Sequence, residues 1–215
     1  MKLAIPFTQA AAVATYEGVT GATLPTRGLC FRVVFKWAAC QAVGGKFKYM
    51  NLNARKTAEK HLAYRQTSLK VENDPSYDFT VDANAKDYVT NDQVQANTYL
   101  AAWGKNFKDA SKTEFSVTPG AASEGDLGSY LAKNSIASVQ SIVYGFYGRA
   151  PDKKSPRGHA VALLGGNSPL FFDPNFGEYT FDSGEDVAGS VAAHIASKYS
   201  NWTQEFYFVM PLVKA

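Results

Sequence analysis

Two cysteines, Cys30 and Cys40, are the candidate nucleophiles in this sequence. Cys30 opens a nearly continuous apolar stretch over residues 29–43, which predicts a buried helix that stops at Gly44-Gly45. A thiol at a helix N-terminus lies beside unpaired N–H groups and the positive end of the helix dipole, and both favour the reactive thiolate. Cys40 lies in the middle of the stretch and is expected to be a small core residue. Cys30 is therefore the predicted nucleophile, with a plain buried thiol as the alternative.

A nucleophilic cysteine needs a base and usually a third group that orients the base. His159 begins a predicted strand, and Gly165-Gly166-Asn167 predicts a three-residue hairpin loop to the next strand, 170–173. In that register His159 lies opposite Asp173, and cross-strand Cβ atoms are about 4.5–5.5 Å apart. The carboxylate could then accept a hydrogen bond from the imidazole and hold its tautomer. The alternative is that Asp173 only begins a turn, in which case Asp182 or Glu178 would be the next candidates.

The other two histidines do not suggest a base or a metal site. His61 lies on a polar helical stretch and is expected to be solvated. His194 lies on a predicted helix with Val187, Val191 and Ile195 and is expected to flank the core. The histidines are far apart in sequence and no Cys-x-x-Cys occurs, so no metal and no cofactor is predicted.

The elements that must position these residues come in two groups. Further helices are expected over 54–70, 91–103 and 124–133, and one capped by Ser183 near the end. Strands are expected over 139–147, 159–164, 170–173, 176–181 and 204–210. Helices first and an antiparallel sheet afterwards predict an α+β fold in which the two parts face each other across a cleft. Residues 1–27 contain several Gly and Pro residues and are expected to be irregular, leaving 28–215 as one catalytic domain.

Bulk properties exclude several classes of protein. The 215 residues fit one ordinary domain, and the net charge of +3 comes from scattered basic residues that do not indicate a nucleic-acid partner. No apolar run approaches the roughly 20 residues needed to cross a bilayer. Pro6, Thr8 and Gln9 interrupt the N-terminal apolar stretch, so a Sec signal peptide is not predicted.

Three motifs together resemble one family. They are Gly-x-Cys before a helix that carries Trp37, the segment Gly158-His159-Ala160-Val161-Ala162, and the Asp-Pro-Asn-Phe-Gly-Glu sequence that starts at Asp173. These motifs resemble the YopT/AvrPphB-type cysteine peptidases, which are bacterial effectors. The resemblance implies a papain-like cysteine protease fold, with the helical part packed on the antiparallel sheet and the active site between them.

The resemblance also assigns roles. It implies Cys30 as the nucleophile, His159 as the base and Asp173 as the orienting acid of a Cys-His-Asp triad. It implies a protein substrate in a target cell, delivery by a bacterial secretion system without a Sec signal, and action in the target-cell cytoplasm. A secretion chaperone or an immunity protein is the further partner that such a toxin implies.

One position departs from the pattern of papain-like enzymes. These often carry a Gln six residues before the Cys that donates into the oxyanion hole, and here that position is Leu24. This departure favours a non-catalytic interpretation, and the triad alone does not separate a peptidase from related acyl-transfer enzymes, so two alternatives stay open. One is an amidase, deamidase or transglutaminase-like toxin built on the same Cys/His/Asp residues, and the other is a non-catalytic interaction module.

Overall fold

The computed structural model describes residues 1–21, 30–45, 47, 118–119, 141–149 and 156–212. In chain order the elements are β1 (Lys2–Pro6), α1 (Gln9–Thr20), α2 (Cys30–Ala42), β2 (Thr118–Pro119), β3 (Ser141–Arg149), β4 (Pro156–Leu164), β5 (Leu170–Asp173), β6 (Gly177–Thr180), α6 (Val187–Lys198) and β7 (Thr203–Leu212). The helices expected over 54–70, 91–103 and 124–133 lie outside the described residues.

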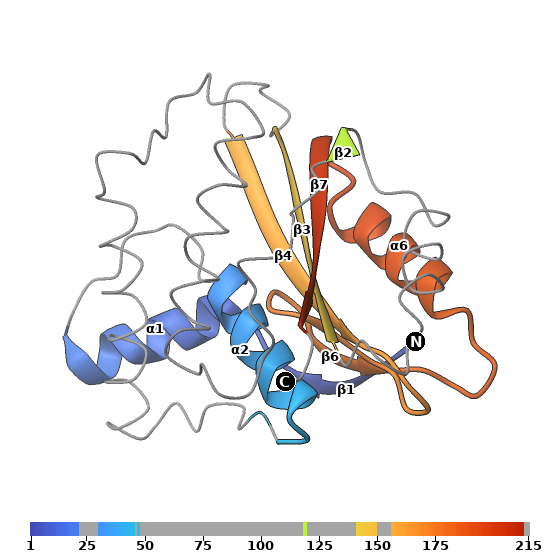
Figure 1. The fold of residues 1–215 in the computed structure, drawn as a ribbon. Coiled ribbons are helices and arrows are strands. Elements are labelled where there is room, and N and C mark those ends of the chain that lie inside the picture. The colour runs from blue at the N-terminus through green and yellow to red at the C-terminus, as the bar shows by residue number, and fades with distance from the viewer. Residues whose placement is uncertain (22–29, 46, 48–117, 120–140, 150–155, 213–215) are drawn as a thin grey trace.

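The strands form one antiparallel sheet in the order β1-β6-β5-β4-β3-β7-β2. This confirms the α+β prediction with an antiparallel sheet, and the predicted strand 170–173 coincides with β5. Helices α2 and α6 lie on opposite sides of the sheet (Figure 1). The sheet is therefore buried by a different helix on each face.

Helix α2 is the buried helix that the apolar stretch predicts. Val34, Trp37 and Ala38 are fully buried. Trp37 stacks on Phe172 of β5, with ring centroids 5.4 Å apart, and its Nε1–H donates to Glu178 Oε2 at 2.7 Å. The helix ends where predicted, because Gly44 adopts φ 71° and its N–H donates to the Gln41 carbonyl at 2.9 Å. These contacts anchor the helix that begins at Cys30.

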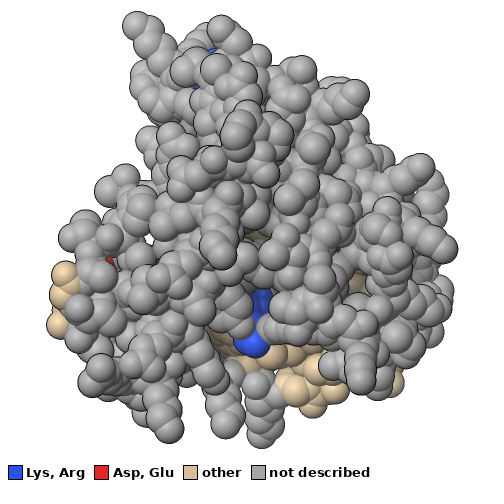
Figure 2. All heavy atoms as spheres, turned by 60° about the vertical axis from the view of Figure 1, so that its left-hand side comes forward, with Lys and Arg blue, Asp and Glu red and all other residues tan. Residues whose placement is uncertain are grey.

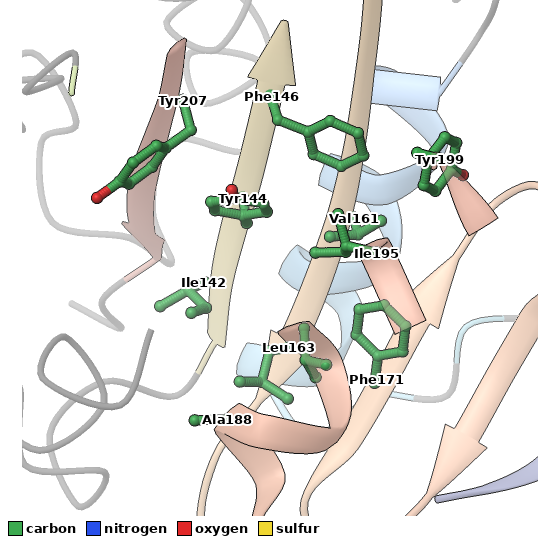
Figure 3. Close-up of a cluster of buried hydrophobic side chains, with 11 residues drawn as sticks. Ile142, Tyr144, Phe146, Val161, Leu163, Phe171, Ala188, Ile195, Tyr199 and Tyr207 are labelled. Carbon is green, nitrogen blue, oxygen red and sulfur yellow. The ribbon is translucent and has the colours of Figure 1, made fainter. Parts of the chain in front are cut away.

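The opposite face of the sheet carries a second apolar layer (Figure 3). Its buried members come from β3, β4, β5, α6 with its C-cap, and β7, and they are Ile142, Tyr144, Phe146, Val161, Leu163, Phe171, Ala188, Val191, Ile195, Tyr199 and Tyr207. Helix α6 begins later than predicted. Its N-cap is Asp186, whose side chain accepts from the Gly189 N–H at 3.1 Å, while the predicted cap Ser183 precedes it in a turn.

The expectation that residues 1–27 are irregular is wrong for most of the segment. Residues 2–6 pair with β6 as an edge strand, and residues 9–20 form helix α1. The Thr8 side chain caps α1 by accepting from the Ala11 N–H at 3.2 Å, and Gly21 ends it at φ 68°. Pro6 and Gly21 therefore mark the ends of elements, while Gly18 lies inside α1. The extent of one catalytic domain over 28–215 stays a prediction.

On the face drawn in Figure 2 the described side chains are mostly uncharged, with a small basic group among them. Across the described ranges, every helix is too short or too polar to span a bilayer.

Candidate active site

His159 and Asp173 meet as predicted, but in a different register. The structure pairs Leu164 with Leu170, whereas the predicted hairpin pairs Leu164 with Ser168, so that register is wrong by two residues. Because the side-chain period of a strand is two, a two-residue shift leaves every side chain on its original face. His159 Nε2 accordingly lies 3.0 Å from Asp173 Oδ1, with both side chains buried. Asp182 and Glu178 are engaged elsewhere, by Lys2 and Trp37.

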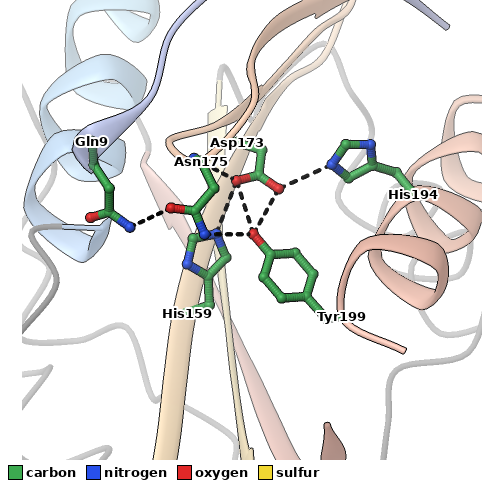
Figure 4. A network of polar contacts seen from close by, with 6 residues as sticks. All are labelled: Gln9, His159, Asp173, Asn175, His194 and Tyr199. Atoms are coloured by element: carbon green, nitrogen blue, oxygen red, sulfur yellow. Dashed lines mark hydrogen bonds and ion pairs between the residues drawn. The ribbon is translucent and has the colours of Figure 1, made fainter. Parts of the chain in front are cut away.

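The Asp173 carboxylate is surrounded by donors (Figure 4). Oδ1 accepts from His159 Nε2 and from the Asn175 backbone N–H at 2.9 Å, and Oδ2 accepts from His194 Nε2 at 3.0 Å. The Tyr199 hydroxyl donates toward both oxygens, at 3.1 and 3.0 Å. A fully buried charge is tolerated only when it is paired and hydrogen-bonded, and this one is both.

The turn after Asp173 is held from the N-terminal segment. The Gln9 backbone N–H donates to the Pro174 carbonyl at 2.6 Å, and Gln9 Nε2 donates to Asn175 Oδ1 at 2.6 Å. Asn175 Nδ2 in turn donates to the Tyr199 hydroxyl at 3.1 Å. The turn closes at Gly177, which adopts φ 124° and passes so close to the Ile5 carbonyl that a Cβ would not fit. Strand β1 and helix α1 thus hold the loop that carries the carboxylate.

The electrostatics of the buried pair favour its charged form. Burial opposes ionisation of Asp173, yet hydrogen bonds from His159 and His194 hold the pKa of this carboxyl well below its ordinary value. Burial also opposes a charge on His159, but the hydrogen bonds with Asp173 and Cys30 raise the pKa of this imidazole from 6.5 to about 9. Burial and the charge of Asp173 raise the pKa of Tyr199, so its hydroxyl stays a donor. The pKa shifts of His159 and Asp173 both favour an imidazolium beside a carboxylate.

Cys30 begins α2 and is partly exposed, and its thiol is among the groups that raise the pKa of His159. Since Nε2 of His159 faces Asp173, Nδ1 is the ring nitrogen left for the thiol. Helix α2 contacts mainly β4 and β3, and β5 stops at Asp173. The ladder between β4 and β5 ends at the pair Ala162 and Phe172, so His159 and Asp173 both lie just past it. Cys40 is also partly buried, and burial raises the pKa of its thiol.

Three contributors to the site were not predicted from the sequence. His194, expected to flank the core, is buried but bonds Asp173 directly, and Tyr199 and Gln9 complete the network. Nothing in the local pattern marks them, because α1 and α6 reach the carboxylate only after docking on the sheet. In the part of the chain that the structure describes, no three His, Cys, Asp or Glu side chains are grouped to hold a metal. Both imidazoles instead point at carboxylate oxygens (Figure 4).

A family model, Yersinia/Haemophilus virulence surface antigen of the C58 peptidases, matches residues 53–214. The chain belongs to this family. The match covers His159, Asp173 and His194, and it extends the resemblance through the middle of the chain, but it begins after Cys30. Membership in this family of bacterial virulence proteins confirms the resemblance to YopT/AvrPphB-type cysteine peptidases.

Two solved structures resemble this C58 chain. The avirulence protein AvrPphB of Pseudomonas is 16% identical, and the match covers 85% of this chain and 90% of AvrPphB with a TM-score of 0.51. PatoxP, a cysteine protease-like domain of the Photorhabdus asymbiotica toxin PaTox, is 13% identical, with 99% of this chain and 53% of that chain covered and a TM-score of 0.42. No curated protein is similar enough in sequence to count as a relative. The AvrPphB match confirms the predicted papain-like α+β fold.

Proposed function

We propose that this C58 chain is a cysteine peptidase that hydrolyses a peptide bond in a protein of a target cell. Cys30 is the nucleophile, His159 the base and Asp173 the group that orients the base. The observation that supports this most directly is the position of His159, which lies 3.0 Å from Asp173 and close enough to Cys30 for the thiol to raise its pKa. The base of a nucleophilic triad has to make both contacts.

In the acylation step the Cys30 sulfur attacks the scissile carbonyl carbon. The thiol proton resides on His159 Nδ1, either before attack or as attack begins, and the imidazolium then gives it to the leaving amine. Asp173 accepts the Nε2–H throughout, so the ring keeps one orientation and the imidazolium is stabilised. The raised pKa of His159 is consistent with a proton held in reserve for the leaving group.

The thioester left on Cys30 is cleared by water. His159, neutral after protonating the amine, removes a proton from the attacking water and returns it to the departing sulfur. Both half-reactions therefore use the same ring nitrogen, Nδ1. The backbone N–H of Cys30 is one expected donor to the oxyanion. Position 24, where papain-like enzymes often have a second donor, lies outside the described residues.

We further propose that the chain is a secreted toxin or effector. The family consists of virulence proteins, and AvrPphB is named an avirulence protein. Delivery by a bacterial secretion system and action in the target-cell cytoplasm follow as parts of this proposal. A protein substrate is the partner it requires, and a chaperone or an immunity protein is a further one to look for.

Cys30→Ala, with Cys40→Ala as the matched control on the same helix, tests the proposal. Host and bacterial lysates exposed to each variant are compared by mass spectrometry of protein termini. New termini with wild type and Cys40→Ala, but not with Cys30→Ala, support a peptidase. Deamidated or cross-linked glutamines without new termini would indicate a deamidase or transglutaminase on the same residues. Equal results for wild type and Cys30→Ala would make the chain an interaction module.

A further inference from the structure

Asp173 is bonded by two histidines and not by one. His159 from β4 occupies Oδ1 and His194 from α6 occupies Oδ2, each at 3.0 Å (Figure 4). The two imidazole side chains are 2% and 4% exposed, so neither contact is shared with bulk water. A Cys-His-Asp triad needs only the first of these contacts, and the second has no role in the acylation and hydrolysis steps.

We propose that His194 is a positioning residue, which holds the second oxygen of Asp173 so that the carboxylate faces His159 in one orientation. This inference rests on the proposed cysteine-peptidase function. His194 acts through Asp173 and does not touch the thiol or the substrate in this role.

The direction of the hydrogen bonds supports this role. An ionised carboxylate can only accept, so the ring nitrogen facing each oxygen must carry a proton. His159 and His194 therefore both present Nε2–H to Asp173. A carboxylate with donors on both oxygens cannot rotate about its Cβ–Cγ bond without breaking at least one of these bonds. Charge-assisted bonds of this kind are also about twice as strong as neutral ones.

The surroundings of His194 keep its ring in place. Three aromatic rings pack edge-on against the imidazole, with centroids 5.2 Å away for Phe171, 5.5 Å for Phe176 and 5.1 Å for Tyr179. Phe171 and Tyr179 belong to β5 and β6, so the sheet and the turn hold the imidazole on the side away from α6. A histidine that merely filled the core would not need its nitrogen aimed at the one buried carboxylate of the candidate site.

Tyr199 does not make His194 redundant. Its hydroxyl has one proton, which it directs between the two oxygens at 3.1 and 3.0 Å. The Tyr199 ring also packs on His159, with centroids 4.8 Å apart. Without His194, the only described side-chain donor to Oδ2 would be the Tyr199 hydroxyl, which it shares with Oδ1. The carboxylate would then lack a donor that bonds Oδ2 alone.

The test compares His194→Gln with His194→Phe in the full chain. Gln places an N–H near the position of His Nε2, whereas Phe keeps the flat ring and removes the donor. Ile195→Val is the control, because Ile195 is buried on the same helix and makes no side-chain hydrogen bond. The substrate-free probe is iodoacetamide at pH 6, with labelling of Cys30 measured by mass spectrometry relative to Cys40 in the same molecule.

We expect His194→Phe to label Cys30 about threefold to tenfold more slowly than wild type, since one charge-assisted bond to Asp173 is lost. His194→Gln should stay within about twofold of wild type. Ile195→Val should lower the melting temperature without changing the labelling ratio. Equal labelling in the Phe variant and the Ile195→Val control, at matched folded fraction, would overturn the proposal.

A second measurement keeps the proposal testable if His194→Phe does not fold. Nitrogen-15 NMR of the wild-type imidazoles should find the His194 proton on Nε2, and a proton on Nδ1 alone would overturn the proposal. Failure of the proposed function is separate, because it shows as undiminished cleavage in Cys30→Ala. Cleavage lost in Cys30→Ala with unchanged labelling in His194→Phe would reject only the role of His194.

Discussion

The two histidines that bond Asp173 make the same contact with its carboxylate but differ in what surrounds the rest of each ring. On each side a buried imidazole places Nε2 at 3.0 Å from an oxygen. The thiol of Cys30 raises the pKa of His159, whereas His194 on α6 is enclosed by aromatic rings. A bond to the candidate catalytic carboxylate therefore does not identify a base. The surroundings of the other ring nitrogen identify the base, because an imidazole can exchange a proton with a nucleophile only if that nitrogen faces the nucleophile.

Removing each imidazole should separate the two sides most clearly. His159→Ala removes the base, and we expect a loss of about three to four decades in kcat/KM, the upper range of general-base contributions. His194→Phe should cost about one decade or less, mostly in kcat. Cleavage kinetics on a substrate found by terminus profiling check both values. Comparable losses for the two variants would mean that the contrast between the sides is not catalytic.

Changing the shared carboxylate should affect both sides at once. Asp173→Asn removes the charge that stabilises the imidazolium, and an amide has only one acceptor oxygen for two N–H donors. We expect a loss of roughly one to three decades, or about 1.4–4 kcal/mol. Adding Asp173→Asn to His159→Ala should cost little more than His159→Ala alone, since residues acting as a unit are not additive. If the two losses multiply, Asp173 does not act through His159.

Between pH 6 and 10 the dependence of stability on pH should come from His159. The pKa of His159 is higher in the folded chain, about 9 against 6.5, so the folded state holds this proton more tightly. The resulting stabilisation is fully present below about pH 6.5 and is lost as pH rises through about 9. The loss should be on the order of 3 kcal/mol, because each tenfold change in proton affinity is worth about 1.4 kcal/mol. Urea midpoints from pH 6 to 10 should fall in wild type and much less in His159→Ala.

The smallest effect is expected at the turn that both sides share. Gln9→Ala removes the side-chain bond to Asn175 but keeps the backbone bond to Pro174. One neutral hydrogen bond is worth about 1 kcal/mol, so we expect at most a severalfold loss of activity and a slightly lower melting temperature. Thr8→Ala, which loosens the start of the same helix without touching the turn, is the control. An unchanged activity in Gln9→Ala would show that the backbone bond suffices.

The hairpin between β4 and β5 shows how the contact between His159 and Asp173 can be predicted correctly from an incorrect register. The glycines at 165 and 166 predict a tight loop, whereas the first paired residues are Leu164 and Leu170. The face of each side chain is still predicted correctly, because successive side chains in a strand alternate between the two faces and the register is wrong by two residues. The N-terminal segment shows the opposite outcome. Its Gly and Pro residues predict an irregular chain, but β1 pairs with β6, a strand more than 170 residues away in sequence. Local patterns contain no information about such a partner.

The sequence by itself determined strands β3 to β7, the buried helix behind Cys30, and the choice of Cys30, His159 and Asp173 as chemical candidates. These rest on hydrophobic period, helix ends and motif, which are local properties. Only the tertiary structure brought α6 and α1 to the carboxylate, and with them His194, Tyr199 and Gln9. Their role depends on which face of which element docks against Asp173. That is decided by packing of the whole sheet between its helices, which no single segment specifies.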